Sequence, residues 1–362
     1  MHRNFFIVTL VLVLLVSACL SPSGDAPAPT ISEETDAIAE SASPVVPEAG
    51  ASGDLVIYSG RSEPLIQPVI DAFKAEYPDV NVLLKAGSNS ELANALIEEQ
   101  ANPQADVFIA TELFTIQALA QQDIFQSYLP DGVEQLPAEF IGPDNEWVGL
   151  TRRARVIMYN SDLVSPDELP SSIFDLTDPR WKGQVAAAGS TNGSMQAQIA
   201  AMRQLIGEEA TEEWLSGLIA NDAVFFGGHT DVRKAVGTGE FKLGLVNHYY
   251  FYLQQVEGSN VGIIFPDQGE GQIGLITNAT SAAIVKEASN LPAAQAFIAF
   301  LVSAEGQRTF ADLNYEYPIL PGVMPREGVQ PLDNFRLSDV DIAQAALEFD
   351  ATFDLMEKVG LP

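Results

Sequence analysis

The 362-residue chain carries 49 acidic but only 18 basic side chains, which gives a formal net charge of −31, and it contains one cysteine. This charge argues against nucleic acid and anionic membrane surfaces as partners, because binding to phosphate groups requires lysine and arginine. It leaves open whether the acidic groups attract a cation or only solvate the surface. A single cysteine also excludes an intrachain disulfide, so the core alone must stabilise the folded part.

The N-terminus has the pattern of a secretory signal peptide. A short basic head precedes an apolar run from Phe5 to Val16, which is too short to span a bilayer comfortably. The run ends in Val-Ser-Ala-Cys at residues 16–19, which resembles a bacterial lipobox. We therefore expect removal of residues 1–18 and lipidation of Cys19, with the protein anchored to the cell membrane on its extracytoplasmic side, in the periplasm or at the outer face. The alternative is a chance cysteine in an ordinary cleavage region.

Residues 19–53 are rich in serine, proline, alanine, glycine and glutamate. Such a segment buries too little apolar surface to offset its ordering entropy, so we expect a flexible tether. The rest of the chain is long enough for two packed lobes of ordinary domain size.

From residue 54 onward, strand-like apolar runs alternate with helix-like amphipathic stretches. The first series comprises residues 55–58, 64–77, 80–86, 90–102, 106–110 and 113–122, and the second has strands at 155–159, 184–188, 223–226 and 243–246 with helical stretches such as 195–206. This alternation predicts an α/β fold with two largely parallel lobes.

The C-terminal third is expected to complete both lobes. Residues 274–285 form a return strand, 291–313 a long amphipathic helix that rejoins the first lobe, and 339–359 a last helix on the second lobe. The predicted boundaries are 54–152 plus 281–330 for lobe 1, and 153–280 plus 331–362 for lobe 2.

The sequence contains few of the residue patterns that enzymes use for catalysis. It has no Gly-x-Ser-x-Gly elbow, and only His229 and His248 remain after signal removal. The glycines of residues 269–274 match a dinucleotide-binding pattern, but a strand follows them where a helix is required. A hydrolase with paired carboxylates remains a rival without a spaced acidic pair to support it. We expect a binding protein and not an enzyme.

The most informative motif is Asn247-His248-Tyr249-Tyr250, which begins where a predicted strand ends. Ligands of open α/β lobes bind at the carboxyl ends of strands. Two adjacent phenols supply hard oxygen donors once deprotonated, which suits Fe(III) better than zinc or copper. The alternative is that these aromatic side chains merely pack the start of a helix.

Several stretches of this chain resemble the ferric-ion-binding proteins of bacterial ABC importers, which have the type II periplasmic binding protein fold. The resemblance covers nearly all of residues 54–362, and its carrying stretches are residues 55–61, 105–108 with Glu112, 151–156, 178–183, 247–250, 303–307 and 316–318. It implies two α/β lobes joined by a hinge, with a cleft that closes on the ligand. It also implies delivery of the ligand to an importer permease, and we expect the protein to be a monomer.

The resemblance further implies a metal site in which Tyr249 and Tyr250 bind Fe(III) as phenolates and Glu112 adds a carboxylate. An ordinary helix-start acid is the alternative for Glu112. The sequence departs from the family at two positions: Ser62 replaces a histidine, and Ser194 stands where one subgroup has a third tyrosine. Iron then needs oxygen from Glu63, from water, or from a synergistic anion such as carbonate or phosphate.

An anion has a predicted site of its own. Guanidinium groups and helix N-termini both favour oxyanions. The candidate residues are Arg61, Ser62, Arg153, Asn192, Gly193, Ser194, His229 and Asn247. Ordinary helix capping is the alternative for residues 192–194.

Two functional alternatives stay open. The same fold can bind an organic or inorganic anion, such as a phosphorylated compound, without iron. The closed form can also engage a receptor in place of a permease. Visible colour distinguishes ferric capture from anion binding without iron, because ferric phenolates absorb visible light and an anion complex does not.

Overall fold

The computed structural model describes residues 50–362, which build two α/β lobes around one continuous 11-stranded sheet. The strand order is β2-β1-β3-β10-β5-β8-β6-β7, with β4 on β10 and both β9 and β11 on β5. The predicted signal peptide, Cys19 and most of the tether lie outside the described residues.

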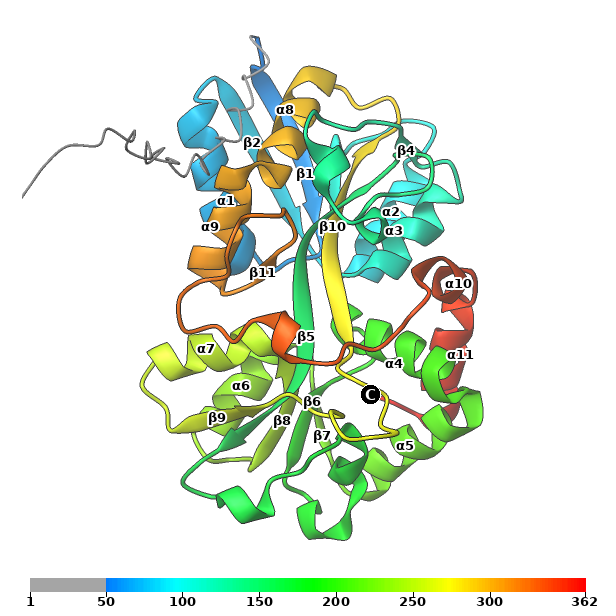
Figure 1. The fold of residues 1–362 in the computed structure, drawn as a ribbon. Helices are drawn as coiled ribbons and strands as arrows, with labels where there is room; N and C mark the ends of the chain where they lie inside the picture. Colours follow the sequence, from blue (N-terminus) through cyan, green and yellow to red (C-terminus); the bar gives the residue numbers. More distant parts are fainter. Residues whose placement is uncertain (1–49) are drawn as a thin grey trace, which may run out of the picture. The chain divides into compact units, whose positions relative to one another are not determined.

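In the first lobe, strands β2, β1 and β3 are parallel, the short strands β4 and β11 pair antiparallel with β10 and β5, and helices cover both faces. It contains β1 (Gly53–Ser59), α1 (Glu63–Glu76), β2 (Val80–Ala86), α2 (Asn89–Glu98), β3 (Val107–Ala110), α3 (Leu113–Ala120), β4 (Phe125–Gln126), α8 (Leu291–Val302), α9 (Ala304–Asn314) and β11 (Tyr317–Pro318). Figure 1 shows α1, α8 and α9 on one side of this part of the sheet and α2 and α3 on the other. All four residues of β3 are buried, as expected for a strand covered on both faces.

The second lobe repeats this plan. It contains β6 (Val185–Ala188), α4 (Gly193–Ile206), α5 (Glu208–Ala220), β7 (Val224–Phe226), α6 (His229–Gly237), β8 (Leu243–Asn247), α7 (His248–Val256) and β9 (Val261–Ile264). Short 3-10 turns lie in the connections of both lobes and are η1 (Val133–Gln135), η2 (Ala138–Phe140), η3 (Pro166–Glu168), η4 (Ile173–Thr177), η5 (Pro179–Trp181) and η6 (Leu332–Asn334). Each lobe has its own hydrophobic core.

Two long strands join the lobes. The first half of β5 (Val148–Asn160) pairs antiparallel with β10 (Thr277–Val285), and its second half pairs with β8 and β9 of the second lobe. The predicted strand over residues 155–159 is therefore only the second half of a 13-residue strand. This crossing brings side chains of β5 to the junction of the lobes (Figure 1).

Both long C-terminal helices predicted from the sequence are broken in two. The break in the first lies at Ser303, whose hydroxyl accepts a hydrogen bond from the Gly306 N–H and starts α9. The last is divided into α10 (Ile342–Leu347) and α11 (Phe349–Val359). The expected packing on the second lobe is correct for α11, which contacts α4 and α5, but α10 lies against α3 of the first lobe. Hydrophobic periodicity continues across both breaks, so it conceals them.

Within residues 50–362, none of the helices has the length and apolar character that crossing a membrane requires.

Candidate functional site

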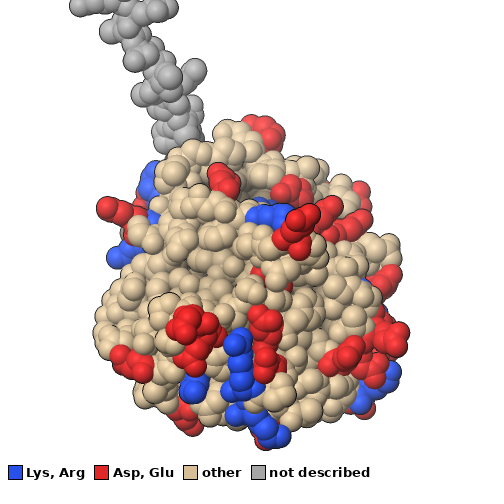
Figure 2. Space-filling view, turned by 60° about the horizontal axis from the view of Figure 1, so that its bottom comes forward, with Lys and Arg blue, Asp and Glu red and all other residues tan. Residues whose placement is uncertain are grey.

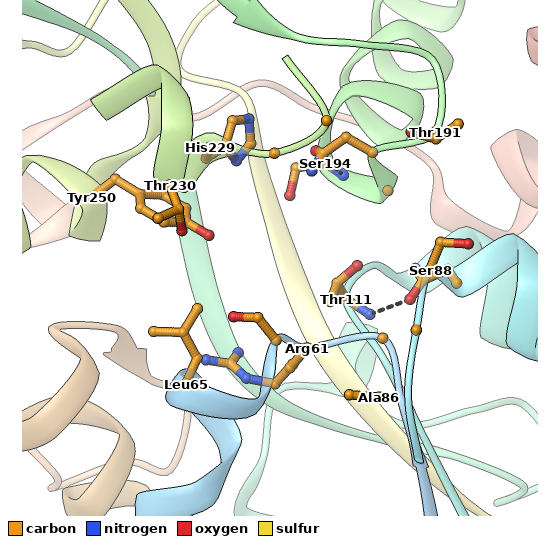
Figure 3. Close-up of a pocket in the computed structure, with 18 of the residues that line it drawn as sticks. Arg61, Leu65, Ala86, Ser88, Thr111, Thr191, Ser194, His229, Thr230 and Tyr250 are labelled. Carbon is orange, nitrogen blue, oxygen red and sulfur yellow. Dashed lines mark hydrogen bonds between the residues drawn. The ribbon is translucent and has the colours of Figure 1, made fainter. Parts of the chain in front are cut away.

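A cavity of about 410 Å³ lies between the lobes, where helix N-termini meet the crossing strand β5. The first lobe and β5 contribute residues 60–62, 65, 86–89, 111 and 153, and the second lobe contributes residues 191–194, 227–230, 249 and 250 (Figure 3). Carboxyl ends of strands and starts of helices thus converge on one cleft, as expected for an open α/β sheet.

The lobes approach each other closely at Gly193. A Cβ atom at this position would lie 2.7 Å from Oγ1 of Thr111 and 2.9 Å from Nδ2 of Asn89, both in the first lobe. Such distances are too short for a side chain, so glycine permits this degree of closure.

Tyr249 and Tyr250 begin α7 and line the cleft with their rings side by side. The ring centroids are 4.4 Å apart with an interplanar angle of 34°, and both side chains are buried. Burial raises the pKa of Tyr250 well above its usual value, and the hydrogen-bonded Tyr249 raises it further. A phenolate at this position therefore needs the charge of a bound cation.

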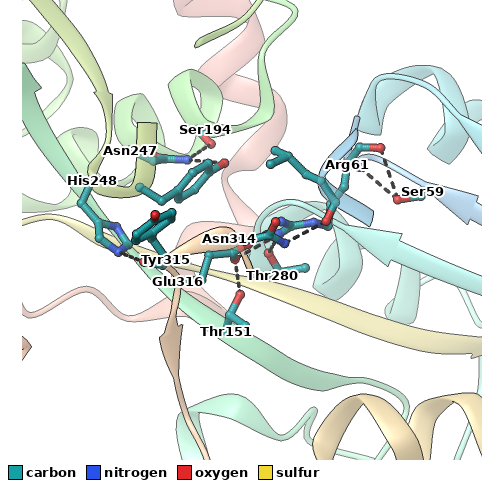
Figure 4. A network of polar contacts seen from close by, with 12 residues as sticks. Ser59, Arg61, Thr151, Ser194, Asn247, His248, Thr280, Asn314, Tyr315 and Glu316 are labelled. Atoms are coloured by element: carbon teal, nitrogen blue, oxygen red, sulfur yellow. Dashed lines mark hydrogen bonds and ion pairs between the residues drawn. The ribbon is translucent and has the colours of Figure 1, made fainter. Parts of the chain in front are cut away.

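Arg61 also lines the cleft, but its guanidinium is already paired. Nη1 donates to Glu316 Oε2 at 3.1 Å and to Thr280 Oγ1 at 3.0 Å, and Nη2 donates to Glu316 Oε1 (Figure 4). The Thr151 hydroxyl donates to the same carboxylate. Burial alone would raise the pKa of Glu316, but Arg61 and the more distant Arg153 lower it, so the pair is ionised.

Arg153 attracts Glu316 from a greater distance but has no hydrogen-bonded carboxylate of its own. Its side chain is 1% exposed, and neither Nε nor Nη2 has a hydrogen-bond partner among residues 50–362. A buried charge without a partner is costly, and this guanidinium borders the cleft. It is therefore the best-placed cation for a bound anion.

Behind the cleft, Arg155 holds two side chains of the second lobe in place by hydrogen bonds. It lies two residues from Arg153, so both share one face of β5, and register places it opposite Asn247. Its Nη1 donates to Asn247 Oδ1 at 3.0 Å and contacts His229 Nε2 at 3.1 Å. Asn247 in turn donates to Ser194 Oγ at 3.1 Å. Asn247 thus supports the cleft without lining it.

Arg155 behind the cleft and His229 in its lining both have lowered pKa values. Burial lowers the pKa of Arg155 to about 9, and burial with repulsion from Arg155 and Arg153 lowers the pKa of His229 well below its usual value. His229 is therefore neutral at neutral pH. Because arginine only donates, Nε2 of His229 accepts from it and Nδ1 carries the proton.

The helix starts around the cleft differ in how they are capped. Asn192 Oδ1 accepts the N–H groups of Ser194 and Met195 at 3.1 and 3.3 Å, so ordinary capping occupies these donors of α4. The first turns of α1 and α6 have no side-chain hydrogen bond from their capping residues, Ser62 and Gly228. In α1, Pro64 has no N–H and Leu65 and Ile66 donate to the Ser62 carbonyl, so the start of α6 at His229 and Thr230 is the one that presents several N–H groups to an anion.

Glu112 lies apart from the tyrosines. It is fully buried as the N-cap of α3, does not line the cleft, and its carboxylate accepts the N–H groups of Phe114 at 2.6 Å and Thr115 at 3.0 Å. Asn89 Nδ2 also donates to it at 3.0 Å. The structure therefore gives Glu112 the capping contacts of the alternative interpretation and does not bring it together with Tyr249 and Tyr250.

No aspartate or glutamate lines the cleft among the described residues. Figure 2 shows acidic side chains, with fewer basic ones, spread over the face in view. Nor do three or more histidine, cysteine, aspartate or glutamate side chains of residues 50–362 gather as a metal site. The described lining of the cleft is therefore basic and phenolic.

Two buried residues of this region have roles that sequence reasoning missed. Glu316 neutralises Arg61, although it lies 255 positions away. His248 accepts the Ala154 N–H at Nδ1 (3.3 Å) and donates from Nε2 to the Tyr315 carbonyl (2.9 Å), which ties the start of α7 to β5. Both residues stood in recognised motifs, but no local signal identifies partners so distant in the chain.

Comparisons with known proteins agree with this geometry. Residues 102–340 match the family of bacterial extracellular solute-binding proteins. Iron uptake protein A1 from Synechocystis is 33% identical, with 88% of this chain and 90% of that protein covered. The Fe(3+)-binding periplasmic protein of Serratia marcescens is 29% identical, with 86% and 92% covered.

Solved structures extend the agreement to the fold. Iron-bound HitA from Pseudomonas aeruginosa has a TM-score of 0.79 and 28% identity, with 85% of this chain and 99% of that chain covered. A Trichodesmium protein (IdiA, FutA) in complex with iron and citrate has a TM-score of 0.69 and 30% identity, with 86% and 100% covered. The fold is that of type II periplasmic binding proteins, as the resemblance implied, and the chain belongs to the family of bacterial extracellular solute-binding proteins.

Proposed function

We propose that this protein captures Fe(III) together with a small anion in the cleft and delivers it to the permease of an ABC importer. One observation carries the proposal: two buried, adjacent phenols face a cleft that also presents the unpaired guanidinium of Arg153. The names of the relatives, an iron uptake protein and an Fe(3+)-binding protein, support the same ligand.

In this proposal Tyr249 and Tyr250 bind iron as phenolates. The ion's charge offsets the burial that raises the pKa of Tyr250. Fe(III) with two phenolates keeps one positive charge, and Arg153 adds another, so an anion such as carbonate, phosphate or citrate is needed for neutrality. The available donors for it are Arg153, the uncapped start of α6 at His229 and the hydroxyl of Ser62, which lines the cleft before α1. Arg61 and Glu112 are not included as ligands, because other contacts occupy them.

Closure completes the site. Lobe 1 (54–152 plus 281–330) and lobe 2 (153–280 plus 331–362) rotate about β5 and β10, and contacts of the ligand with both lobes shift the population towards the closed form. We further propose that Cys19 is lipidated and holds the monomeric protein at the membrane, on its extracytoplasmic side, where the permease recognises the closed lobes.

An absorption titration of the protein with ferric citrate tests the iron site. We expect a visible charge-transfer band that saturates near one iron per chain and disappears in the Tyr249→Phe/Tyr250→Phe variant. Tyr252→Phe is the matched control, because this tyrosine lies on the same helix and its hydroxyl accepts the Gln330 N–H instead. No band in the unaltered protein would contradict the proposal.

A second candidate is an anion carrier without iron. The unpaired Arg153 and the absence of acidic side chains from the described cleft lining favour it. In that case phosphate or a phosphorylated compound would raise the melting temperature, and ferric iron would leave it unchanged.

A further inference from the structure

A buried histidine links the tyrosine pair to the first lobe. His248 is fully buried at the first position of α7, directly before Tyr249 and Tyr250. Its Nε2 donates to the backbone carbonyl of Tyr315 at 2.9 Å, and Tyr315 is the C-cap of α9 in the first lobe (Figure 4). Its Nδ1 accepts the N–H of Ala154 in β5 at 3.3 Å. These two contacts hold the ring in one neutral tautomer, with a donor at Nε2 and an acceptor at Nδ1.

Aromatic neighbours fix the plane of this imidazole ring. Tyr317 of β11 stacks on it, with ring centroids 4.1 Å apart and an interplanar angle of 15°. Tyr249 meets it edge to face, at 5.8 Å and 83°, and Tyr252 does so at 6.3 Å and 81°. Both arrangements are favourable for aromatic pairs. Tyr249 therefore packs against a ring whose position is set by residues of the first lobe.

One short segment of the first lobe contacts groups of both lobes at the site. The Tyr315 carbonyl and the Tyr317 ring hold His248. Between them in the chain, Glu316 pairs with Arg61, which lines the cleft. The position of the tyrosines in the second lobe is thus linked to the first-lobe side of the cleft by three consecutive residues.

The contacts of His248 lie on the strand that joins the lobes. Ala154 belongs to β5, and Tyr317 is paired with Arg152 of the same strand. In the proposed closure the lobes rotate about β5 and β10, and groups close to a rotation axis move little. The hydrogen bonds of His248 can therefore persist in both the open and the closed form.

We propose that His248 is a positioning residue for the tyrosine pair. Its bond to the Tyr315 carbonyl and its contact with Tyr249 keep the two phenols in one position relative to the first-lobe side of the cleft, so that they meet iron in a single arrangement. This inference rests on the proposed function, because it places the iron at Tyr249 and Tyr250. A histidine that only packed the start of α7 would contribute to stability and not to the geometry of the iron site.

Two substitutions separate the hydrogen bonds of His248. Asparagine places its Oδ1 near the position of Nδ1 and keeps the acceptor for Ala154, whereas glutamine places its Nε2 near the position of the histidine Nε2 and keeps the donor for Tyr315. Each substitution removes one buried hydrogen bond, so both should lower the melting temperature of the iron-free protein.

The iron site should respond to only one of them. In an absorption titration with ferric citrate, we expect His248→Asn to shift the visible band and to weaken iron binding about tenfold, equivalent to about 1.4 kcal/mol. We expect His248→Gln to keep the band of the unaltered protein, with an affinity within about threefold of it. The position of the band is a property of the bound iron, so it does not depend on how much of the protein is folded.

Two further variants test the aromatic contacts. Tyr252→Phe removes a hydroxyl from the same cluster, one that accepts the Gln330 N–H at 3.1 Å, and leaves both hydrogen bonds of His248 in place. It should lower the melting temperature without moving the band. Tyr317→Leu removes the ring on which His248 stacks and should shift the band in the same direction as His248→Asn. It provides the test if His248→Asn does not fold.

The outcomes are distinct. If the unaltered protein binds iron but the substitutions at His248 and Tyr317 leave the band in place, His248 only packs the helix start and the proposed function stands. The same conclusion follows if His248→Asn and His248→Gln weaken iron binding equally, in step with their melting temperatures. If the unaltered protein shows no band, the proposed function is wrong and this inference with it.

Discussion

The guanidinium of Arg61 and the carboxylate of Glu316 form a buried ion pair, and both side chains are at most 1% exposed. The pair links the loop before α1 to the segment after α9, and it neutralises one of the two arginines that line the cleft. Arg153 is thereby left as the unpaired charge that faces the ligand.

Removal of one partner of this pair should be strongly destabilising. Glu316→Gln leaves the buried Arg61 charge uncompensated, so we expect the free energy of unfolding to fall by about 3–5 kcal/mol. Urea denaturation measures this change. Glu305→Gln, which breaks an exposed pair with Arg308, is the control and should cost less than about 1 kcal/mol. Equal effects of the two substitutions would show that the buried pair has no special role.

The same pair makes stability depend on pH in the acid range. The pKa of Glu316 is lowered in the native state, so as the pH falls the unfolded chain takes up this proton before the native protein does. The stabilisation is therefore complete above the unfolded pKa of about 4.3 and is lost as the pH falls towards the native value. We expect Glu316→Gln to flatten the loss of unfolding free energy below about pH 4.3. Parallel curves for the two proteins would contradict the assignment.

Arg153 should lower the stability of the ligand-free protein and strengthen the binding of the anion. Replacement by methionine removes a buried guanidinium whose Nε and Nη2 have no hydrogen-bond partner and loses only its attraction to the more distant Glu316, so we expect the ligand-free protein to gain about 1–3 kcal/mol of unfolding free energy. Dependence of iron binding on added citrate or carbonate should disappear. Arg152→Met is the matched control, because this neighbour points to the other face of β5 and pairs with Glu139. A less stable Arg153→Met variant with unchanged anion dependence would make Arg153 a structural residue.

Gly193 should control closure of the cleft. A valine at this position would collide with Thr111 and Asn89 across the lobes, so the closed form should lose about 1–3 kcal/mol. We expect iron affinity to fall about tenfold to a hundredfold, with a larger radius of gyration by small-angle X-ray scattering in the presence of iron. Gly227→Val is the control, because a Cβ there meets no atom within 4 Å although the residue also lines the cleft. Unchanged iron affinity in Gly193→Val would show that binding does not require the lobes to approach each other at Gly193.

The sequence by itself determined the alternation of strands and helices, the family and the place of Tyr249 and Tyr250 at the end of β8. These features depend on local periodicity and on motifs that are contiguous in the chain. Helix breaks at Ser303 and Glu348 were missed, because the apolar pattern continues through them.

Only the tertiary structure decided what each charged group of the site does. Glu112 caps α3, Arg61 is neutralised by Glu316, and Arg153 remains unpaired. The physical reason is that a charge in low dielectric is governed by the nearest opposite charge or hydrogen-bond donor. That neighbour is chosen by how the lobes pack, and 255 residues separate Arg61 from Glu316 in the chain.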